Sequence, residues 1–356
     1  SIFEWLAIEK VDSQLDVPII KTQVKLNLES MRNWCATERK IKMDGSNESI
    51  VKQRRQLQEM AHAYRKSQIL LSCVELGVFD ALAGRSASAA EVAHTLAADA
   101  HAVEILLNAA TALGLVQKHG SNFSNSPLAE TQLTQSTTGG MVQRLRMERA
   151  FYCRWEHLVE AVRSGKRPEE TQAGEQPEGW VRSFIYGLYD HVRPVAPLVA
   201  EALAFPEDQP VRVLDVGGGH GGYSIALAQR YPNLTATVFE LPRVVPVARE
   251  IIEKAGLSER IQVQAGDFQQ EELGSGFDMA LVFGVLNGEP LDKRPLLIHK
   301  VFSALNPGGQ IVLRDQVLEP DRTAPPEATL FAVQLLLSTD GGGLDTREDW
   351  ALWLAS

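Results

Sequence analysis

The chain has 356 residues, 44% of them hydrophobic, which is enough for two domains or for one large domain with an appendage. Its 45 acidic residues outnumber its 35 basic residues and give a net charge of −10, so we expect neither nucleic acid nor an anionic membrane as a partner. No apolar run reaches the roughly 18–20 residues that span a bilayer, and no signal-peptide pattern opens the chain.

The three cysteines, Cys35, Cys73 and Cys153, lie far apart and form no CxxC pair. This pattern favours buried free thiols in a reducing compartment over disulfides or a zinc site, so we expect a cytoplasmic protein without a bound metal. The chain begins at Ser1 rather than Met and stops inside the helical pattern TREDWALWLAS. We therefore expect it to be part of a longer polypeptide, such as a multidomain synthase, or a truncated product of low stability.

Composition and periodicity divide the chain into four parts. The first shows no sustained periodicity, ends in the loop-like MDGSNES at 43–49, and receives no role. The others are a helical module, a helical linker and an alternating α/β domain. The boundaries of the four parts are 1–50, 51–140, 141–207 and 208–356.

The second part reads as an all-helical winged-helix module with a small wing. Helices are predicted over 63–84 and 100–116, and Ser88 and Glu91 between them have the spacing of a capping box. The polar stretch KHGSNFSNSP then predicts the wing. The would-be recognition helix contains no Lys or Arg over residues 101–113, so it lacks the donors that DNA recognition needs. We expect this module to mediate dimerisation.

The linker is helical and rich in aromatic residues. Most of these residues suit an interhelical core, but some can line an apolar pocket for a small acceptor. The candidates for that pocket are Phe151, Trp155, Phe184 and His191. His157 lies on the same helices, and both histidines are either structural or close enough to reach the pocket.

From residue 211 onward, strands alternate with helices. Strands are predicted over 211–216, 235–241, 261–268, 277–286 and 309–317. This alternation predicts a doubly wound parallel sheet, a Rossmann-like α/β fold, with helices on both faces. Its ligand should lie at the carboxyl ends of the strands, near the first one.

The stretch DVGGGHGG joins the first strand to its helix. Gly217, Gly219 and Gly222 satisfy the G-x-G-x-x-G spacing of a dinucleotide site, but such a loop allows close approach of other ligands too. Asp215 would repel a pyrophosphate and could instead support a cation. Glu240 ends the second strand, where an acid can take both ribose hydroxyls, a feature that NAD sites share.

Residues at the end of the third strand extend this pattern. In GDF, Asp267 can accept the amino hydrogens of an adenine and Phe268 can stack on its ring. The motifs DVGGGHG, VFELP, GDF and LNPGGQIVL, in this order, resemble those of the class I S-adenosylmethionine (SAM)-dependent methyltransferases, and specifically the caffeate and acetylserotonin O-methyltransferase type with its bacterial tailoring relatives. ELGVFDAL, LNAATALGLV and W-x-H-L-x-x-A-V-x-x-G match as well, so the resemblance covers about residues 55–356.

The resemblance implies SAM as the cofactor and a homodimer as the assembly. It also implies that Asp215 and Gly217 lie beside the methionine moiety, Glu240 at the ribose, and Asp267 and Phe268 at the adenine. His220 occupies a variable position of the loop, and we expect it to have no chemical role. The implied cofactor site consists of Asp215, Gly217, Gly219, Glu240, Leu241, Gly266, Asp267 and Phe268.

The catalytic base of the family is missing. In the resembled family a His after the fourth strand removes the proton of the acceptor, and here Asn287 stands at that position. An amide can hydrogen-bond but cannot take a proton at neutral pH. Asp315, at the end of the fifth strand, matches a family acid, and Glu289 could replace the base or could merely flank a helix N-terminus. Where the family has a second acid, this chain has Leu344, with Asp345 beside it.

Three interpretations follow. The protein methylates an already acidic hydroxyl or enol of a small aromatic or polyketide-like acceptor, with Asn287 positioning it. Alternatively, the acceptor is a carbon or nitrogen atom. Finally, the domain binds the cofactor without transferring a methyl group, as an inactive relative.

The resemblance also implies a sheet of seven strands, of which the last two would follow Ser356. We therefore expect the C-terminal strands to be missing and the fifth strand to be an apolar edge that is prone to aggregation. A clean, stable dimer of this chain in dynamic light scattering would contradict that expectation.

Overall fold

The structure is a computed structural model that describes residues 45–135, 140–168, 178–203, 205 and 209–355. The chain forms two compact units, Ser1–Arg65 and Lys66–Ser356. The first unit contains helix α2 (Gly45–His62), and the boundary with the second unit falls in the first turn of the next helix. The stretch MDGSNES was expected to be a loop, but residues 45–49 belong to this helix. Ser and Asn are common at helix starts as well as in loops, and the long charged run that follows favours helix.

The second unit begins with the winged-helix module, which surrounds a small core that includes Phe79, Leu107 and Phe123. The predicted wing is a hairpin, and a third strand that the sequence did not predict pairs with it antiparallel in the order β1-β3-β2. The capping box at Ser88 and Glu91 is present on both sides. The elements are α3 (Tyr64–Leu76), α4 (Val78–Ala81), β1 (Ser86–Ser88), α5 (Ala89–Leu96), α6 (Ala100–Ala112), β2 (Val116–His119), β3 (Asn122–Asn125) and α7 (Pro127–Gln132).

Buried free thiols were expected for the cysteines, and this is correct for Cys73 but wrong for Cys153. Cys73 is buried in the module and burial raises the pKa of its thiol to about 12, whereas Cys153 is exposed. Cys153 lies on the outer side of its helix, where Nη1 of Arg149 approaches its Sγ at 3.0 Å. Cys35 lies outside the described residues.

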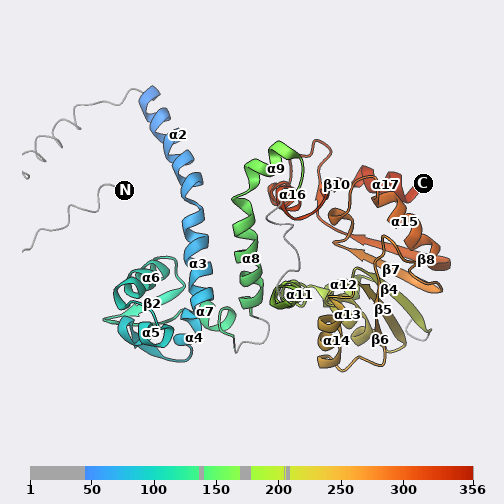
Figure 1. Ribbon diagram of the computed structural model, residues 1–356, viewed down its shortest axis with the longest axis horizontal. Helices are drawn as coiled ribbons and strands as arrows, with labels where there is room; N and C mark the ends of the chain where they lie inside the picture. Colours follow the sequence, from blue (N-terminus) through green and yellow to red (C-terminus); the bar gives the residue numbers. More distant parts are fainter. Residues whose placement is uncertain (1–44, 136–139, 169–177, 204, 206–208, 356) are drawn as a thin grey trace, which may run out of the picture. The chain divides into compact units, whose positions relative to one another are not determined.

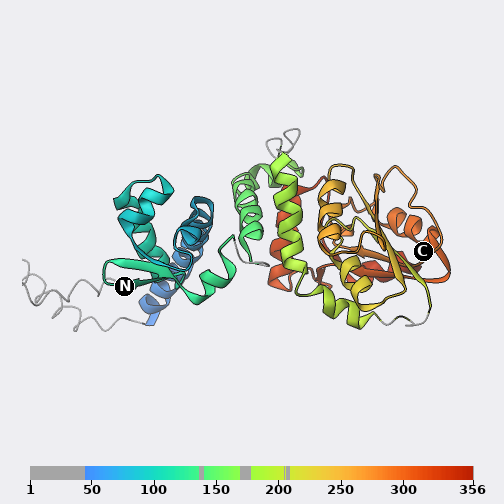
Figure 2. The same ribbon diagram turned by 90° about the horizontal axis from the view of Figure 1, so that it is seen from below.

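The linker is helical, as predicted, and contains α8 (Val142–Trp155), α9 (Leu158–Ser164), α11 (Glu178–Val192) and α12 (Ala196–Ala202). Helix α8 packs along α11, and the later helix α16 (Pro326–Ser338) packs against α8 and α9. Figure 1 shows α8 beside both α11 and α16, which lie at different heights along it, and Figure 2 shows the same helices after a turn of 90°. Three segments that are far apart in sequence therefore meet at α8.

The α/β part contains a parallel sheet with the strand order β6-β5-β4-β7-β8 within the described residues (Figure 1). All five predicted strands are present, although the fifth begins four residues earlier than expected. The order reverses between β4 and β7, so the switch point lies beside the first strand, as predicted. The strands are β4 (Val211–Val216), β5 (Leu234–Glu240), β6 (Ile261–Ala265), β7 (Phe277–Phe283) and β8 (Leu305–Arg314).

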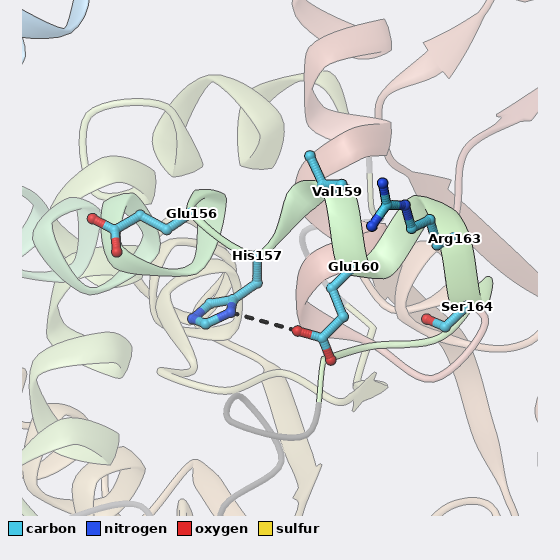
Figure 3. A pocket seen from close by; sticks show the side chains of 6 residues that line it. All are labelled: Glu156, His157, Val159, Glu160, Arg163 and Ser164. Carbon is cyan, nitrogen blue, oxygen red and sulfur yellow. Dashed lines mark ion pairs between the residues drawn. The ribbon is translucent and has the colours of Figure 1, made fainter.

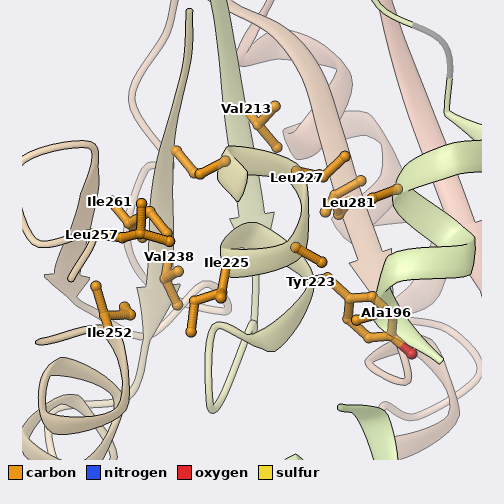
Figure 4. Packing of buried hydrophobic residues seen from close by; sticks show 14 of the residues in the cluster. Ala196, Val213, Tyr223, Ile225, Leu227, Val238, Ile252, Leu257, Ile261 and Leu281 are labelled. Carbon is orange, nitrogen blue, oxygen red and sulfur yellow. The ribbon is translucent and has the colours of Figure 1, made fainter. Parts of the chain in front are cut away.

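Helices bury both faces of this sheet. Because neighbouring residues of a strand point to opposite faces, Val213 packs on one side and Leu214 on the other. On the first side, α12, α13 (Gly222–Arg230) and α14 (Val245–Lys254) cover the aliphatic cluster drawn in Figure 4. On the other side, the core involves α15 (Arg294–Ser303) and Trp353 of α17 (Arg347–Ala355).

Short elements follow the carboxyl ends of β7 and β8. The 3₁₀ turn η2 (Leu286–Gly288) follows β7, and β9 (Val317–Leu318) follows β8. Strand β9 pairs in parallel with β10 (Asp345–Thr346), just before α17. Among the described helices, none combines the length and the apolar character that crossing a membrane requires.

Candidate active site

The glycine loop lies at the carboxyl end of β4. Gly217 and Gly219 have left-handed φ angles of 60° and 53°, which glycine adopts without a steric cost. Asp215 lies under the loop with 1% exposure, and Oγ of Ser224 donates a 2.6 Å hydrogen bond to its Oδ2. A Cβ atom at Gly218 would lie 2.5 Å from Cγ of Asp215. The loop therefore sits directly on this carboxyl group.

Burial dominates the electrostatics of Asp215. It raises the pKa of the carboxyl group to about 6, and the hydrogen bond from Ser224 opposes the shift. The sequence did not reveal Ser224 as a partner, because its hydroxyl reaches Asp215 only after α13 folds back over the loop.

Glu240, the last residue of β5, holds the loop from the neighbouring strand. Its Oε2 accepts a 2.9 Å hydrogen bond from the backbone N–H of Gly219, and its Oε1 accepts one of 2.7 Å from Leu241. Burial raises the pKa of this carboxyl group, and the two backbone donors oppose the shift. The structure thus brings Glu240 to the glycine loop, and its predicted contact with a ribose stays a prediction.

The segment after β6 completes this side of the site. The ring of Phe268 approaches the loop, because a Cβ atom at Gly217 would lie 3.7 Å from its Cε1. The carboxylate of Asp267 accepts hydrogen bonds from the backbone of Gln269 and from Nε2 of Gln270. Residues predicted from three strands therefore gather at one edge of the sheet.

His220 has a structural place in the loop. It is buried, and its Nδ1 accepts a 2.8 Å hydrogen bond from the backbone N–H of Gly222 at the start of α13. Burial lowers the pKa of its imidazole to about 4, so the ring is neutral at pH 7. This arrangement supports the expectation that His220 has no chemical role.

Asn287 and Asp315 form a pair at the carboxyl ends of β7 and β8. Nδ2 of Asn287 donates a 2.6 Å hydrogen bond to Oδ1 of Asp315, and both side chains are largely buried. Burial raises the pKa of Asp315, and the amide of Asn287 opposes the shift. In the described part of the chain, no donor contacts Oδ1 of Asn287.

The structure does not place Glu289 with this pair. Its carboxylate accepts a 2.8 Å hydrogen bond from Nε2 of Gln269, in the segment that also carries Asp267. Burial raises the pKa of Glu289, and the negative charge of Asp267 adds to that effect. Glu289 therefore contacts the side of the site that was predicted to receive the adenine.

A buried ion pair fixes the segment before α17. Arg294 pairs with Asp345, and the two side chains are 3% and 4% exposed. Arg294 also donates to the carbonyl oxygens of Glu289 and Gly343, each at 3.0 Å. The backbone N–H of Gly343 in turn donates to the carbonyl oxygen of Asn287 at 2.9 Å. Asp345 is thus committed to an arginine, and Leu344 packs in an apolar cluster.

Three of the four predicted pocket residues lie where α8, α11 and α16 meet. The rings of Phe151 and Phe184 meet edge to face at 6.3 Å, and Nε1 of Trp155 donates to Oε1 of Gln334 at 2.6 Å. His191 lies at the end of α11 and makes none of these contacts, but the positive charge of Arg314, the last residue of β8, acts on it. Burial lowers the pKa of His191, and the positive charge of Arg144 lowers it further, so the ring is neutral.

A separate hollow of about 540 Å³ lies at the start of α9. Figure 3 shows its lining, which comes from one segment, with the ion pair between Nδ1 of His157 and Glu160 at 3.6 Å. None of the predicted pocket residues lines it. His157 therefore belongs to this surface hollow.

Fold and site together define a class I methyltransferase. The O-methyltransferase domain family matches residues 155–354, and the O-methyltransferase dimerisation domain family matches residues 58–135. The chain belongs to the O-methyltransferase family and is a SAM-dependent methyltransferase.

Individual relatives agree with this assignment. The chain is 31% identical to the 3-hydroxy-5-methyl-1-naphthoate 3-O-methyltransferase of Streptomyces sahachiroi, over 83% of this chain and 87% of the relative. It is also 31% identical to the N,N-dimethyltransferase OxyT of Streptomyces rimosus, over 77% and 81%. The human N-acetylserotonin methyltransferase in complex with SAM is similar in structure, with a TM-score of 0.74 and 28% identity over 85% of this chain and 90% of the other.

The residues present fit the cofactor. The glycine loop has no side chain above Asp215, and two carboxylates with an aromatic ring stand around it. We infer from this arrangement that Asp215 and Gly217 hold the methionine part, Glu240 the ribose, and Asp267 with Phe268 the adenine. Gly219, Leu241 and Gly266 form the backbone between these groups.

Proposed function

We propose that the protein methylates an acidic hydroxyl group, a phenol or an enol, on an aromatic or polyketide-like acceptor. The observation that carries the proposal is the hydrogen bond between Asn287 and Asp315. A carboxylate only accepts hydrogen bonds at neutral pH, so the amide must turn its nitrogen toward Asp315. Its oxygen then faces away from Asp315 and can accept a hydrogen bond from the acceptor.

This pair orients the acceptor but does not deprotonate it. The amide oxygen of Asn287 would accept the hydrogen bond of the hydroxyl group and fix the direction of its lone pairs. SAM supplies the electrophilic methyl group when it is bound. Without a side chain to take the proton, the hydroxyl group that Asn287 orients loses its proton to water before the methyl transfer, so acidic hydroxyls should react fastest.

Two relatives bear on the acceptor. The naphthoate methyltransferase from Streptomyces sahachiroi acts on an aromatic hydroxyl, which agrees with the proposal. OxyT, at the same identity, carries the name of an N,N-dimethyltransferase and supports nitrogen as a second candidate. A neutral amine needs no general base before it attacks a methyl group, and this too is compatible with an amide at residue 287.

The test is a labelled-methyl transfer assay with phenols and naphthols of graded acidity, and with matched aromatic amines. For the hydroxyl acceptors, kcat/KM should rise about tenfold per pH unit and level off at the pKa of each acceptor. A plateau at one fixed pH for every acceptor would reveal a general base of the enzyme and contradict the proposal. Transfer to the amines alone would favour the second candidate.

The match to the dimerisation domain supports a homodimer. Light scattering coupled to size exclusion should give twice the mass of one chain, 39.2 kDa, and a monomer at micromolar concentration would contradict it. The cytoplasmic location inferred from the cysteines stays a prediction.

A further inference from the structure

One arginine in the predicted acceptor region has no carboxylate partner among the residues that the structure describes. Arg154, near the end of α8, is half-buried where α8, α11 and α16 meet. Its guanidinium carbon lies 5.5 Å from the ring centroid of Phe151 and 5.4 Å from that of Trp180. Its Nη1 donates a 3.2 Å hydrogen bond to the hydroxyl of Ser338. The cation therefore lies against two aromatic rings and one neutral acceptor.

The described charges around Arg154 do not neutralise it. Within the described residues, no carboxylate pairs with it, and the charged group that acts on it is another cation, Arg167. Burial lowers the pKa of Arg154, and the charge of Arg167 lowers it further, but a guanidinium stays protonated in proteins. A half-buried cation without a counter-ion is unfavourable unless something else pairs with it.

Arg182 on α11 also stacks on an aromatic ring but has a carboxylate partner, which Arg154 lacks within the described part of the chain. Its guanidinium also lies over an aromatic ring, that of Tyr186 at 5.0 Å, but Glu250 pairs with it at 2.5 Å and at 2.8 Å. Arg182 has its carboxylate and is more exposed to water. Stacking alone therefore does not account for the missing partner of Arg154.

Arg154 is connected to the Asn287–Asp315 pair through α16. Its partner Ser338 is the last residue of that helix, and the loop that follows reaches Gly343, whose N–H binds the carbonyl oxygen of Asn287. The side-chain amide of Gln334 makes two hydrogen bonds here. Its Oε1 accepts from Nε1 of Trp155, and its Nε2 donates to the hydroxyl of Ser338 at 2.7 Å. Ser338 and the loop after α16 thus link Arg154 to the backbone of Asn287.

We propose that Arg154 binds a carboxylate of the acceptor, so that the acceptor is an aromatic carboxylic acid bearing the hydroxyl group to be methylated. The inference rests on the proposed function and names its substrate class. A guanidinium offers two parallel N–H donors to a carboxylate, and the flat rings beside it suit an aromatic acceptor. The acceptor would supply the negative charge that the described part of the chain does not place at Arg154.

The experiment compares a hydroxynaphthoic acid with its hydroxynaphthamide, which keeps the shape and loses the charge. Binding of each to the full chain saturated with S-adenosylhomocysteine is measured by calorimetry, and labelled-methyl transfer is measured separately with SAM. The acid should bind at least about tenfold more tightly than the amide, since one charge-assisted pair is lost. In Arg154→Gln this ratio should fall to about one, and in Arg154→Lys it should be intermediate.

Arg182→Gln is the matched control and should keep the wild-type ratio. Equal binding of acid and amide to the wild type would overturn the proposal, as would a ratio that survives in Arg154→Gln. Retained affinity for S-adenosylhomocysteine shows that a variant is folded, and the wild-type comparison does not depend on any variant. Tighter binding of the acid without transfer to it would contradict the proposed function and leave the carboxylate site standing.

Discussion

Nδ2 of Asn287 donates a 2.6 Å hydrogen bond to Oδ1 of Asp315, and this contact joins the ends of two neighbouring strands. Oδ1 of Asp315 also accepts from the backbone N–H of Gln316 at 2.8 Å, and the backbone N–H of Asn287 approaches Oδ2 at 3.4 Å. The carboxylate is held by several donors and in turn holds the amide. The position where the family has a base thus carries a fixed hydrogen-bond acceptor.

Replacing the amide tests how much this orientation contributes. Asn287→Ala should lower kcat/KM modestly, by about 2- to 10-fold, because one neutral hydrogen bond is worth about 0.5–1.5 kcal/mol. The measurement is methyl transfer to an acidic naphthol, with affinity for S-adenosylhomocysteine as the control. Loss of all activity at unchanged affinity would show that Asn287 does more than orient.

Asp315 should act through Asn287. In Asp315→Asn, the partner of the amide becomes another amide, which can present either nitrogen or oxygen, so Asn287 loses its fixed orientation. We expect a loss similar to that of Asn287→Ala, and a double variant scarcely worse than either single one. If the losses of kcat/KM in the two single variants multiplied in the double variant, Asp315 would contribute independently of Asn287, for example as a base.

The cofactor side of the site could be predicted because its signals are local. The glycine loop, Glu240 and Asp267–Phe268 each end a strand, and parallel strands bring their carboxyl ends to one edge. The direction of a side chain after the strand end is not local. Glu289 could be a base from its sequence position, yet it contacts Gln269 because the turn η2 directs it toward the neighbouring segment.

The acceptor side depends on tertiary contacts that no short motif encodes. Trp155 and Gln334 are 179 residues apart and share a hydrogen bond only because α16 returns to pack against α8. Arg154 adjoins the W-x-H-L motif, but the lack of a carboxylate beside it among the described residues becomes visible only when the surrounding helices are in place. For His191, chosen from the same aromatic helices, the described part of the structure gives no hydrogen bond to this group, and its place in the pocket stays a prediction.

The buried carboxyl group of Asp215 should make stability depend on pH. Its folded pKa of about 6 lies above the unfolded value of 3.8, so its contribution favours folding below pH 4 and is lost as pH rises through 6. A shift of about two units corresponds to about 3 kcal/mol. Asp215→Asn removes this dependence. Its melting temperature should therefore rise relative to that of the wild type as the pH increases from 4.5 to 7.5. Equal gaps in melting temperature at both pH values would contradict the burial effect.

Adding a methyl group to the glycine loop at Gly218 should strongly weaken cofactor binding. In Gly218→Ala the new Cβ would lie 2.5 Å from Cγ of Asp215, and the carboxyl group is too tightly packed to move away. We expect calorimetric affinity for SAM to fall more than tenfold, because the loop must shift. Gly179→Ala on α11 is the control, since nothing lies within 4 Å of its Cβ and alanine favours helix. Unchanged affinity in Gly218→Ala would show that the loop is not a rigid cradle.

The pair of Arg294 and Asp345 should carry more stability than any exposed ion pair of the protein. Both side chains are nearly inaccessible, so Asp345→Asn leaves a buried guanidinium without its counter-ion, at a cost of about 3–5 kcal/mol. Arg182→Gln, which breaks the more exposed pair with Glu250, should cost at most about 1 kcal/mol. Denaturant unfolding of both variants gives the comparison.

Asp345→Asn should also affect the reaction, through the position of Asn287. Arg294 holds the carbonyl oxygens of Glu289 and Gly343, and Gly343 holds the backbone of Asn287, so losing the ion pair loosens the amide. Asp345→Asn should therefore lower kcat while leaving affinity for S-adenosylhomocysteine nearly unchanged. The double variant Arg294→Met/Asp345→Leu, which removes both charges, should recover stability but not kcat, because Met cannot donate to either carbonyl. If the double variant recovered full activity, the hydrogen bonds of Arg294 to this segment would have no part in placing Asn287.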